Sequence, residues 1–321
     1  MPALIKHTLA DNCRKRKKMK PTVSVIVPTF NRAELIKTSV RSVLNQTYQD
    51  FEIIIIDDGS TDDTEKVVKN LNDDRIRYIR HERNKGAPAA RNTGIRSARG
   101  KYLAFQDSDD EWMPEKLERQ MAIFRGAVSD VGVVYSGFWK VKDNKRLYFP
   151  PPQIRKKEGN VYKNLLEENF VAMPSAVIKS ECFKKAGMFD EELPRYQDWE
   201  LFIRISKHYN FAFVSKPLLV AYHQHNGISS DKDALLRARK MILKKHFRGF
   251  EKGGRKLLSK QYYLLGLSFS EKDDLKTCRK YFGKALMVYP LNVKCFFAIL
   301  LSVAGSNILN KLMEYKMRLY K

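Results

Sequence analysis

Two apolar runs that end in clustered aspartates constrain this chain more than any other feature. Residues 53–56 are four isoleucines, and they lead directly into Asp57 and Asp58. Residues 102–105 (YLAF) are followed by a second acidic cluster at 107–110 (DSDD). Such runs are typical of strands buried on both faces in sheets covered by helices. Open sheets of this kind bind ligands at the carboxyl edge, so the sequence predicts an α/β protein with an acidic ligand site there.

The second acidic cluster also indicates a metal. Helix capping is the alternative explanation for both clusters, and it fits residues 57–61. It fits residues 107–110 poorly, because three carboxylates within four residues repel one another unless a cation lies among them. We therefore expect a divalent metal, Mn²⁺ or Mg²⁺, together with a phosphate-bearing ligand.

The order of the predicted elements defines the fold class. Strand and helix patterns alternate through the first half of the chain, which favours an open, mostly parallel sheet flanked by helices. We expect strands at 23–27, 51–56, 75–79, 101–105 and 131–135, with helices near 33–44, 61–70, 88–98 and 114–124. Beyond about residue 231 the pattern is wholly helical, and it fits either one tetratricopeptide-type helix pair or a plain helical appendage.

The charge distribution separates the chain into three parts. Most of the formal net charge of +24 lies in residues 1–20, with seven Lys and Arg against one Asp, and in residues 237–321, with twenty against five acids. We therefore predict a basic N-terminal tail (1–20), a central α/β domain (21–230) and a basic helical region (231–321). Basic terminal segments favour binding to anionic partners, either phospholipid headgroups or nucleic acid. No nucleic-acid recognition motif is present, so we expect an anionic membrane surface and no nucleic acid.

The location follows from the same observations. The four cysteines are scattered without a metal-type spacing, and the N-terminus has no apolar leader. These features predict a cytoplasmic protein, peripheral on the inner face of the cell membrane. Residues 291–310 hold an apolar run that is shorter than the roughly 20 residues needed to span a bilayer. This run either lies in the membrane interface or forms a core helix of the helical region.

The first strand–helix turn excludes two common nucleotide-binding classes. A dinucleotide-binding protein has a GxGxxG sequence in this turn, whereas residues 28–32 are PTFNR and contain no glycine. A phosphate-binding P-loop is absent as well. These exclusions leave a nucleotide that is held by side chains and a metal.

Six segments, in this order, resemble the inverting GT-A glycosyltransferases of family 2. They are residues 23–32 (VSVIVPTFNR), 45–47 (NQT), 56–61 (IDDGST), 86–94 (GAPAARNTG), 105–113 (FQDSDDEWM) and 197–201 (QDWEL). The resemblance spans about residues 23–230 and implies the nucleotide-diphospho-sugar transferase fold. It also implies metal-dependent transfer of a sugar, with a UDP-sugar favoured, to a saccharide or lipid-linked acceptor in cell-surface glycan synthesis. A non-catalytic sugar-nucleotide-binding protein and a basic nucleic-acid-binding protein are the alternatives.

The resemblance implies roles for the donor-side residues. Residues 107–109 match the DxD motif, in which Asp109 would coordinate the metal and Asp107 would face the ribose, with Ser108 between them. Asp58 would accept the N3–H of uracil. The remaining donor contacts are implied for Pro28, Thr29 and Arg32 at the base and ribose and for Arg91 at the diphosphate. A solvated helix face is the alternative for Arg91.

Two further residues are implied on the acceptor side. Asp198 matches the family's general base, which deprotonates the acceptor hydroxyl, and Gln197 stands where the family often has Glu. A helix N-cap is a second role for Asp198, compatible with the first. His225 matches a C-terminal histidine that contacts metal or phosphate, and a structural histidine is the alternative.

Overall fold

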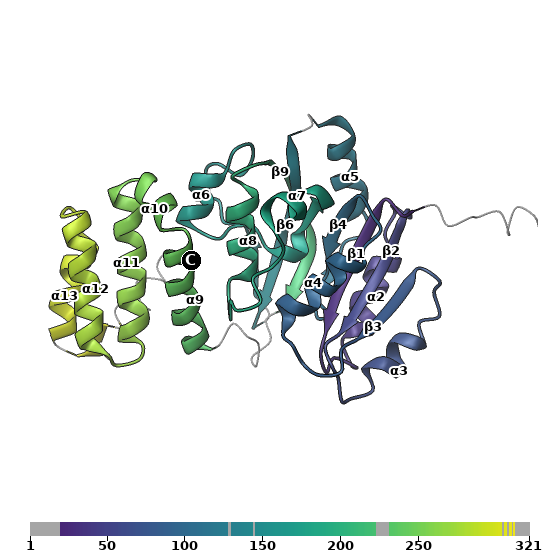
Figure 1. The fold of residues 1–321 in the computed structure, drawn as a ribbon, viewed down its shortest axis with the longest axis horizontal. Helices are drawn as coiled ribbons and strands as arrows, with labels where there is room; N and C mark the ends of the chain where they lie inside the picture. Colours follow the sequence, from purple (N-terminus) through teal and green to yellow (C-terminus); the bar gives the residue numbers. More distant parts are fainter. Residues whose placement is uncertain are drawn as a thin grey trace, which may run out of the picture.

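The computed structural model describes residues 20–127, 130–143, 145–222 and 231–303, together with 305, 306, 308, 309 and 311. Residues 1–19 of the predicted basic tail lie outside the described residues, and so does His225. The described part folds into a mixed sheet flanked by helices, followed by a row of helices that extends from one side of it (Figure 1).

The described strands form one nine-stranded sheet with the order β3-β2-β1-β4-β8-β6-β9-β5, and β7 pairs with β6. The strands β3, β2, β1 and β4 pair in parallel, as expected from the alternating pattern. β8 is antiparallel to both β4 and β6, and β5 is antiparallel to β9, so the second half of the sheet is mixed. The strands are β1 (Val23–Thr29), β2 (Phe51–Asp57), β3 (Ile76–Arg80), β4 (Tyr102–Phe105), β5 (Glu111–Trp112), β6 (Val131–Lys142), β7 (Lys145–Phe149), β8 (Ala176–Lys179) and β9 (Asn210–Tyr222).

Helices cover the sheet, and the central strands are buried on both faces. Successive side chains of a strand point to opposite faces, and here Val25 and Ile26 enter different hydrophobic clusters. All seven residues of β1 and of β2 are buried, which explains the long apolar runs. The helices of this part are α2 (Ile36–Leu44), α3 (Thr64–Lys69), α4 (Ala87–Ser97), α5 (Lys116–Gly126), α6 (Tyr162–Glu167), α7 (Ser180–Ala186) and α8 (Gln197–Ile205), with a short 3₁₀ helix at Met173–Ser175.

The C-terminal region is a row of antiparallel helices beside α8 (Figure 1). Gly266 on α11 permits close packing against α12, because a Cβ there would lie 2.4 Å from the Phe282 ring. The tetratricopeptide assignment stays a prediction, and so does the boundary near residue 230. No helix in the described part of the chain is long and apolar enough to cross a membrane. The helices are α9 (Lys232–Lys245), α10 (Phe247–Lys252), α11 (Arg255–Ser270), α12 (Leu275–Val288) and α13 (Val293–Val303).

Candidate active site

The loop after β2 presents Asp58 at the carboxyl edge of the sheet. Its carboxylate accepts backbone N–H groups from Lys85 (2.9 Å) and Gly86 (2.7 Å), just before α4. Gly86 has φ of 91°, a left-handed conformation that glycine adopts without strain. This turn brings the two amides onto one carboxylate. Asp58 is therefore held in a fixed position at the edge of the sheet and is only 3% exposed.

His81, which no motif in the sequence indicated, holds Asp58 in place. His81 follows β3, and its Nδ1 lies 2.7 Å from Oδ1 of Asp58. Its Nε2 lies 3.0 Å from the hydroxyl of Thr93 on α4. The imidazole is buried, so it links the ends of two strands to a helix and restricts the rotation of Asp58.

The loop after β4 carries the second acidic cluster and is held by a polar scaffold. The Ser39 hydroxyl donates to the backbone oxygen of Asp107 (2.9 Å), and the Gln106 amide donates to the backbone oxygen of Asp110 (2.6 Å). The Asp107 carboxylate pairs with Nη2 of Arg91 at 2.9 Å. With only 13% of its side chain exposed, Arg91 does not lie on a solvated helix face.

Burial and neighbouring negative charge raise the pKa of two carboxylates of this loop. Burial raises the pKa of Asp109, the charge of Asp107 raises it further, and the Arg32 guanidinium opposes both effects. The pKa of Asp110 is raised well above its usual range by burial and by the charges of Asp107 and Asp109. The loop therefore concentrates negative charge that a cation would stabilise.

This donor set fits a metal that is shared with a ligand. Among the described residues no group of three or more His, Cys, Asp or Glu side chains comes together as a metal site. Mg²⁺ typically binds through one or two carboxylates and completes its shell with water and substrate phosphates. Asp109 with a neighbouring carboxylate suits that arrangement, whereas a metal held wholly by protein side chains does not fit the described residues.

Asp198 lies on the first turn of α8 and lines a pocket together with Asp58 and Asp109. The N-cap residue of α8 is Tyr196, which has φ of 62°, so Asp198 is not the cap. One carboxylate oxygen accepts the Trp199 N–H (2.7 Å), and the Asn169 amide lies 3.4 Å from the other. Burial raises the pKa of Asp198, while the Trp199 N–H and the charge of Arg91 oppose the rise.

One pocket of about 820 Å³ brings these groups together. Nine of the ten predicted site residues line it: Pro28, Thr29, Arg32, Asp58, Arg91, Asp107, Ser108, Asp109 and Asp198. The tenth, His225, lies outside the described residues. Arg91 connects two of the segments that line the pocket, because it pairs with Asp107 and its Nη1 also lies 3.5 Å from Oε1 of Gln197. Asn169, which contacts Asp198, is a further lining residue that the sequence analysis missed.

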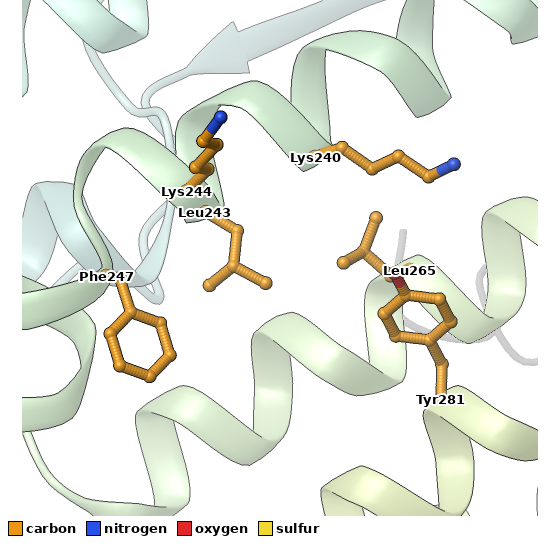
Figure 2. A pocket seen from close by; sticks show the side chains of 6 residues that line it. All are labelled: Lys240, Leu243, Lys244, Phe247, Leu265 and Tyr281. Carbon is orange, nitrogen blue, oxygen red and sulfur yellow. The ribbon is translucent and has the colours of Figure 1, made fainter.

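A second hollow lies between the helices of the C-terminal region (Figure 2). Its floor is apolar, and two lysines lie beside it. The lining residues are Lys240, Leu243, Lys244, Phe247, Leu265 and Tyr281. It has no carboxylate among these residues, so the acidic pocket of the sheet is the candidate active site.

The α/β sheet has an acidic pocket at the carboxyl ends of its strands. This arrangement is typical of α/β proteins that bind a ligand at the edge of the sheet. The model of glycosyl transferase family 2 matches residues 24–186, so the chain belongs to this family. An uncharacterized glycosyltransferase of Methanocaldococcus jannaschii is 35% identical over 207 residues, which cover 62% of this chain and 70% of the relative. A Rickettsia bellii glycosyltransferase is 34% identical over 66% of this chain, but that match spans only 30% of the relative.

A third relative and two solved structures extend the comparison. The Escherichia coli UDP-Glc:alpha-D-GlcNAc-diphosphoundecaprenol beta-1,3-glucosyltransferase WfgD is 29% identical over 65% of this chain and 80% of its own length. S. aureus TarS 1–349 in complex with UDP-GlcNAc superposes with a TM-score of 0.65 at 22% identity, over 84% of this chain and 80% of that chain. The mannosyltransferase PcManGT from Pyrobaculum calidifontis, in complex with GDP-Man and Mn²⁺, gives 0.58 at 19% identity, over 95% and 92%. These structures support the fold.

Proposed function

We propose that this protein is a metal-dependent inverting glycosyltransferase. It moves a sugar from a nucleotide-diphosphate donor, with a UDP-sugar favoured, to a saccharide or lipid-linked acceptor in cell-surface glycan synthesis. The observation that carries the proposal is the single pocket in which Asp58, Asp109 and Asp198 converge from three separate segments. A protein that only binds a sugar nucleotide has no need of a carboxylate on the acceptor side.

The donor is held along the edge of the parallel strands. Asp58 keeps a lone pair for the N3–H of uracil, because its known partners occupy only part of the carboxylate's acceptor capacity. Pro28 and Thr29 flank the base and ribose, and Asp107 faces the ribose. Arg32 and Arg91 supply fixed positive charge for the diphosphate. The UDP-GlcNAc complex of TarS is consistent with this choice of donor.

Asp109 would hold the divalent metal, Mn²⁺ or Mg²⁺, with the donor phosphates completing its shell. When bound, such an ion would neutralise the charge that develops on the departing diphosphate. The raised pKa of Asp109 supports the assignment, because the carboxylate lacks a full counter-charge of its own. His225 remains a further proposed ligand from the sequence.

Asp198 would act as general base. The acceptor oxygen attacks the anomeric carbon from the face opposite the diphosphate, and its proton passes to the Asp198 carboxylate. The anomeric carbon–oxygen bond breaks, and the bonding electrons leave with the nucleoside diphosphate. One displacement of this kind inverts the anomeric configuration. The Asn169 amide and the Trp199 N–H keep the carboxylate oriented towards the pocket.

The acceptor and the location follow from the relatives and the charge. WfgD is named for a diphosphoundecaprenol-linked acceptor, and the basic helical region suits an anionic bilayer. We therefore assign the protein to the inner face of the cell membrane, as a peripheral protein acting on a saccharide or lipid-linked acceptor.

A panel of nucleotide sugars tests the donor and the metal together. Hydrolysis without acceptor should be fastest for a UDP-sugar and should require Mn²⁺ or Mg²⁺. Asp109→Asn should fold normally but lose most of this activity at every metal concentration, because an amide cannot replace an anionic ligand. Asp63→Asn, which changes an exposed carboxylate on the neighbouring loop, is the matched control. Near-normal turnover of the Asp109 variant would refute the assignment.

A further inference from the structure

The last described long helix presents an apolar stripe to solvent. Residues at helical spacing on α13 are 52–74% exposed: Val293, Phe296, Phe297, Leu300 and Val303. Met287, near the end of α12, and Leu291, just before α13, are also exposed, at 76% and 75%. Scattered exposed apolar residues are ordinary, but a contiguous apolar surface marks an interaction site.

The opposite face of α13 packs against the rest of the protein. Cys295, Ala298 and Ser302 are buried, and the Arg279 guanidinium on α12 donates to the hydroxyl (3.0 Å) and backbone oxygen (2.6 Å) of Ser302. The helix is therefore anchored in a fixed orientation. Its exposed stripe is a stable surface of the folded protein.

The charge around the stripe is of one sign. From Leu275 to Val303 the chain contains five basic residues and no acidic residue. Lys276, Lys280 and Lys294 are exposed. A helix with an apolar face and lysines beside it suits the interface of an anionic bilayer, where the apolar side chains enter the acyl boundary and the lysines meet phosphates.

We propose that the outer face of α12 and α13 docks on a bilayer that contains anionic phospholipids. A second copy of this chain is the less favourable occupant, because two such faces would bring like charges together without an acidic residue to offset them. The biological use of docking rests on the proposed function, since it would hold the enzyme near a lipid-linked acceptor. The surface itself does not depend on that function.

The test is co-sedimentation of the full-length protein with vesicles of phosphatidylcholine, alone or mixed with phosphatidylglycerol. The protein should bind the anionic vesicles and dissociate as salt is raised. Phe297→Ser combined with Leu300→Ser should lower the partition coefficient by roughly tenfold or more, because two apolar side chains leave the interface. Lys280→Gln and Lys294→Gln should each lower it by about fivefold.

The control is Leu147→Ser, which changes a leucine that is 46% exposed on β7, and it should bind like the unchanged protein. Thermal melting and UDP-sugar hydrolysis without vesicles show that each variant is folded.

A protein that hydrolyses no nucleotide sugar yet binds vesicles refutes the proposed function alone. Equal binding by the Phe297/Leu300 variant overturns the docking proposal, as does failure of the unchanged protein to bind at low salt. A dimer that is detected by analytical ultracentrifugation and that the Phe297/Leu300 variant dissociates would also overturn the docking proposal. Vesicle binding that begins only after residues 312–321 are deleted would overturn it as well.

Discussion

At the residue scale, Asp198 should control the rate of transfer and its dependence on pH. Asp198→Asn should bind donor and metal normally, because Asp198 lies on α8 and not in the loops that carry Asp58 and Asp109, but should transfer sugar roughly 10²–10⁴-fold more slowly. Donor binding is measured by calorimetry and transfer by single turnover. Glu192→Gln, an exposed carboxylate on the loop before α8, is the control. A variant that no longer binds donor would instead make Asp198 structural.

The direction of the pH dependence follows from the raised pKa of Asp198. A general base works only when it is deprotonated, and burial makes its proton harder to lose. The acidic limb of the kcat/KM profile should therefore lie at higher pH than the ordinary aspartate value of 3.8. In Asp198→Asn this limb should disappear. If it persists unchanged in the residual activity, another group is responsible for it.

His81 should act on the donor through Asp58 and is therefore a positioning residue. His81→Phe removes the imidazole nitrogen that lies 2.7 Å from Asp58, so the carboxylate gains freedom to turn away from the base. We expect KM for the UDP-sugar to rise by roughly tenfold while kcat for hydrolysis changes little. His81→Gln, which can donate to Asp58, should recover part of the loss. His208→Phe changes an exposed histidine and is the control, and a fall in kcat alone would contradict the positioning role.

The sequence predicted the acidic residues of the pocket but not the residues that hold their carboxylates in place. Asp58 and Asp109 follow apolar runs, and buried strand ends in a parallel sheet meet at one edge, so their convergence was foreseeable. His81 and Asn169 lie in irregular segments without a periodic pattern. Their contacts with Asp58 and Asp198 depend on how distant loops fold over the sheet. Only the three-dimensional structure brings these pairs together.

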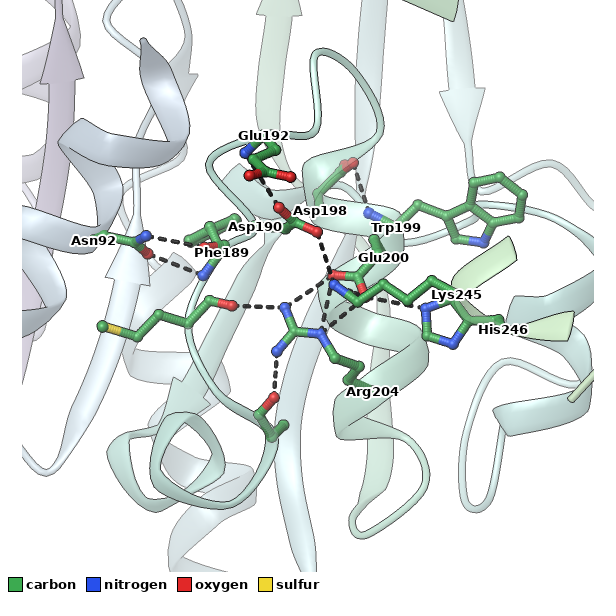
Figure 3. A network of polar contacts seen from close by, with 12 residues as sticks. Asn92, Phe189, Asp190, Glu192, Asp198, Trp199, Glu200, Arg204, Lys245 and His246 are labelled. Carbon is green, nitrogen blue, oxygen red and sulfur yellow. Dashed lines mark hydrogen bonds and ion pairs between the residues drawn. The ribbon is translucent and has the colours of Figure 1, made fainter. Parts of the chain in front are cut away.

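At the scale of elements, a buried charge network joins α8 to α9 (Figure 3). Glu200, two residues after Asp198, accepts from Arg204 (2.9 Å) on the same helix. It also accepts from His246 Nε2 and Lys245 Nζ, each at 3.0 Å, at the end of α9. Lys245 in turn pairs with Asp190. The helix that carries the proposed base is thus fixed by the C-terminal region.

Glu200→Gln should therefore destabilise the protein. The side chain is 1% exposed, and removing one partner of a buried ionic group costs about 3–5 kcal/mol. Burial alone would raise the pKa of Glu200, but the His246 and Arg204 hydrogen bonds and the Arg204 charge lower it to about 2. A lowered carboxyl pKa adds stability above the unfolded value near 4.5, and that stability is lost as the pH falls towards 2. Urea unfolding from pH 6 downwards should show a shallower pH dependence in the variant, with Glu181→Gln as an exposed control.

The parallel elements were predictable from the sequence, and the antiparallel strands β5 and β7 were not. Strands such as β1 and β2 are long, apolar and separated by helical patterns, so their identity and direction follow from the alternation. β5 has only two residues, and its pairing with β9 joins segments about a hundred residues apart. β7 is partly exposed and charged at its start. Short or exposed strands carry no periodic signal, so tertiary pairing alone determines them.

At the scale of the whole molecule, the helical region is continuous with the core of the sheet domain. One hydrophobic cluster runs from Ile26 and Phe105 in the central strands through Phe202 on α8 to Phe250 and Phe282 in the C-terminal helices. Polar contacts cross the same boundary, because the Gln261 amide donates to the backbone oxygen of Leu166 (3.3 Å). Composition alone suggested a separable appendage, since charge and periodicity change near residue 231. Packing joins the two parts.

Truncation after residue 230 should therefore damage the catalytic part. It removes the His246 and Lys245 partners of Glu200 and the C-terminal part of the hydrophobic cluster that includes Phe202. Loss of these partners of the buried Glu200 alone should lower the melting temperature by roughly 10 °C or more, and calorimetry measures the change. Truncation after Pro290, which removes α13 but leaves α9 to α12 in place, should be tolerated far better because it does not reach the α8 network. If residues 20–230 alone melt at the temperature of the full chain and bind a UDP-sugar with equal affinity, the helical region is an independent unit and the base on α8 needs no support from it.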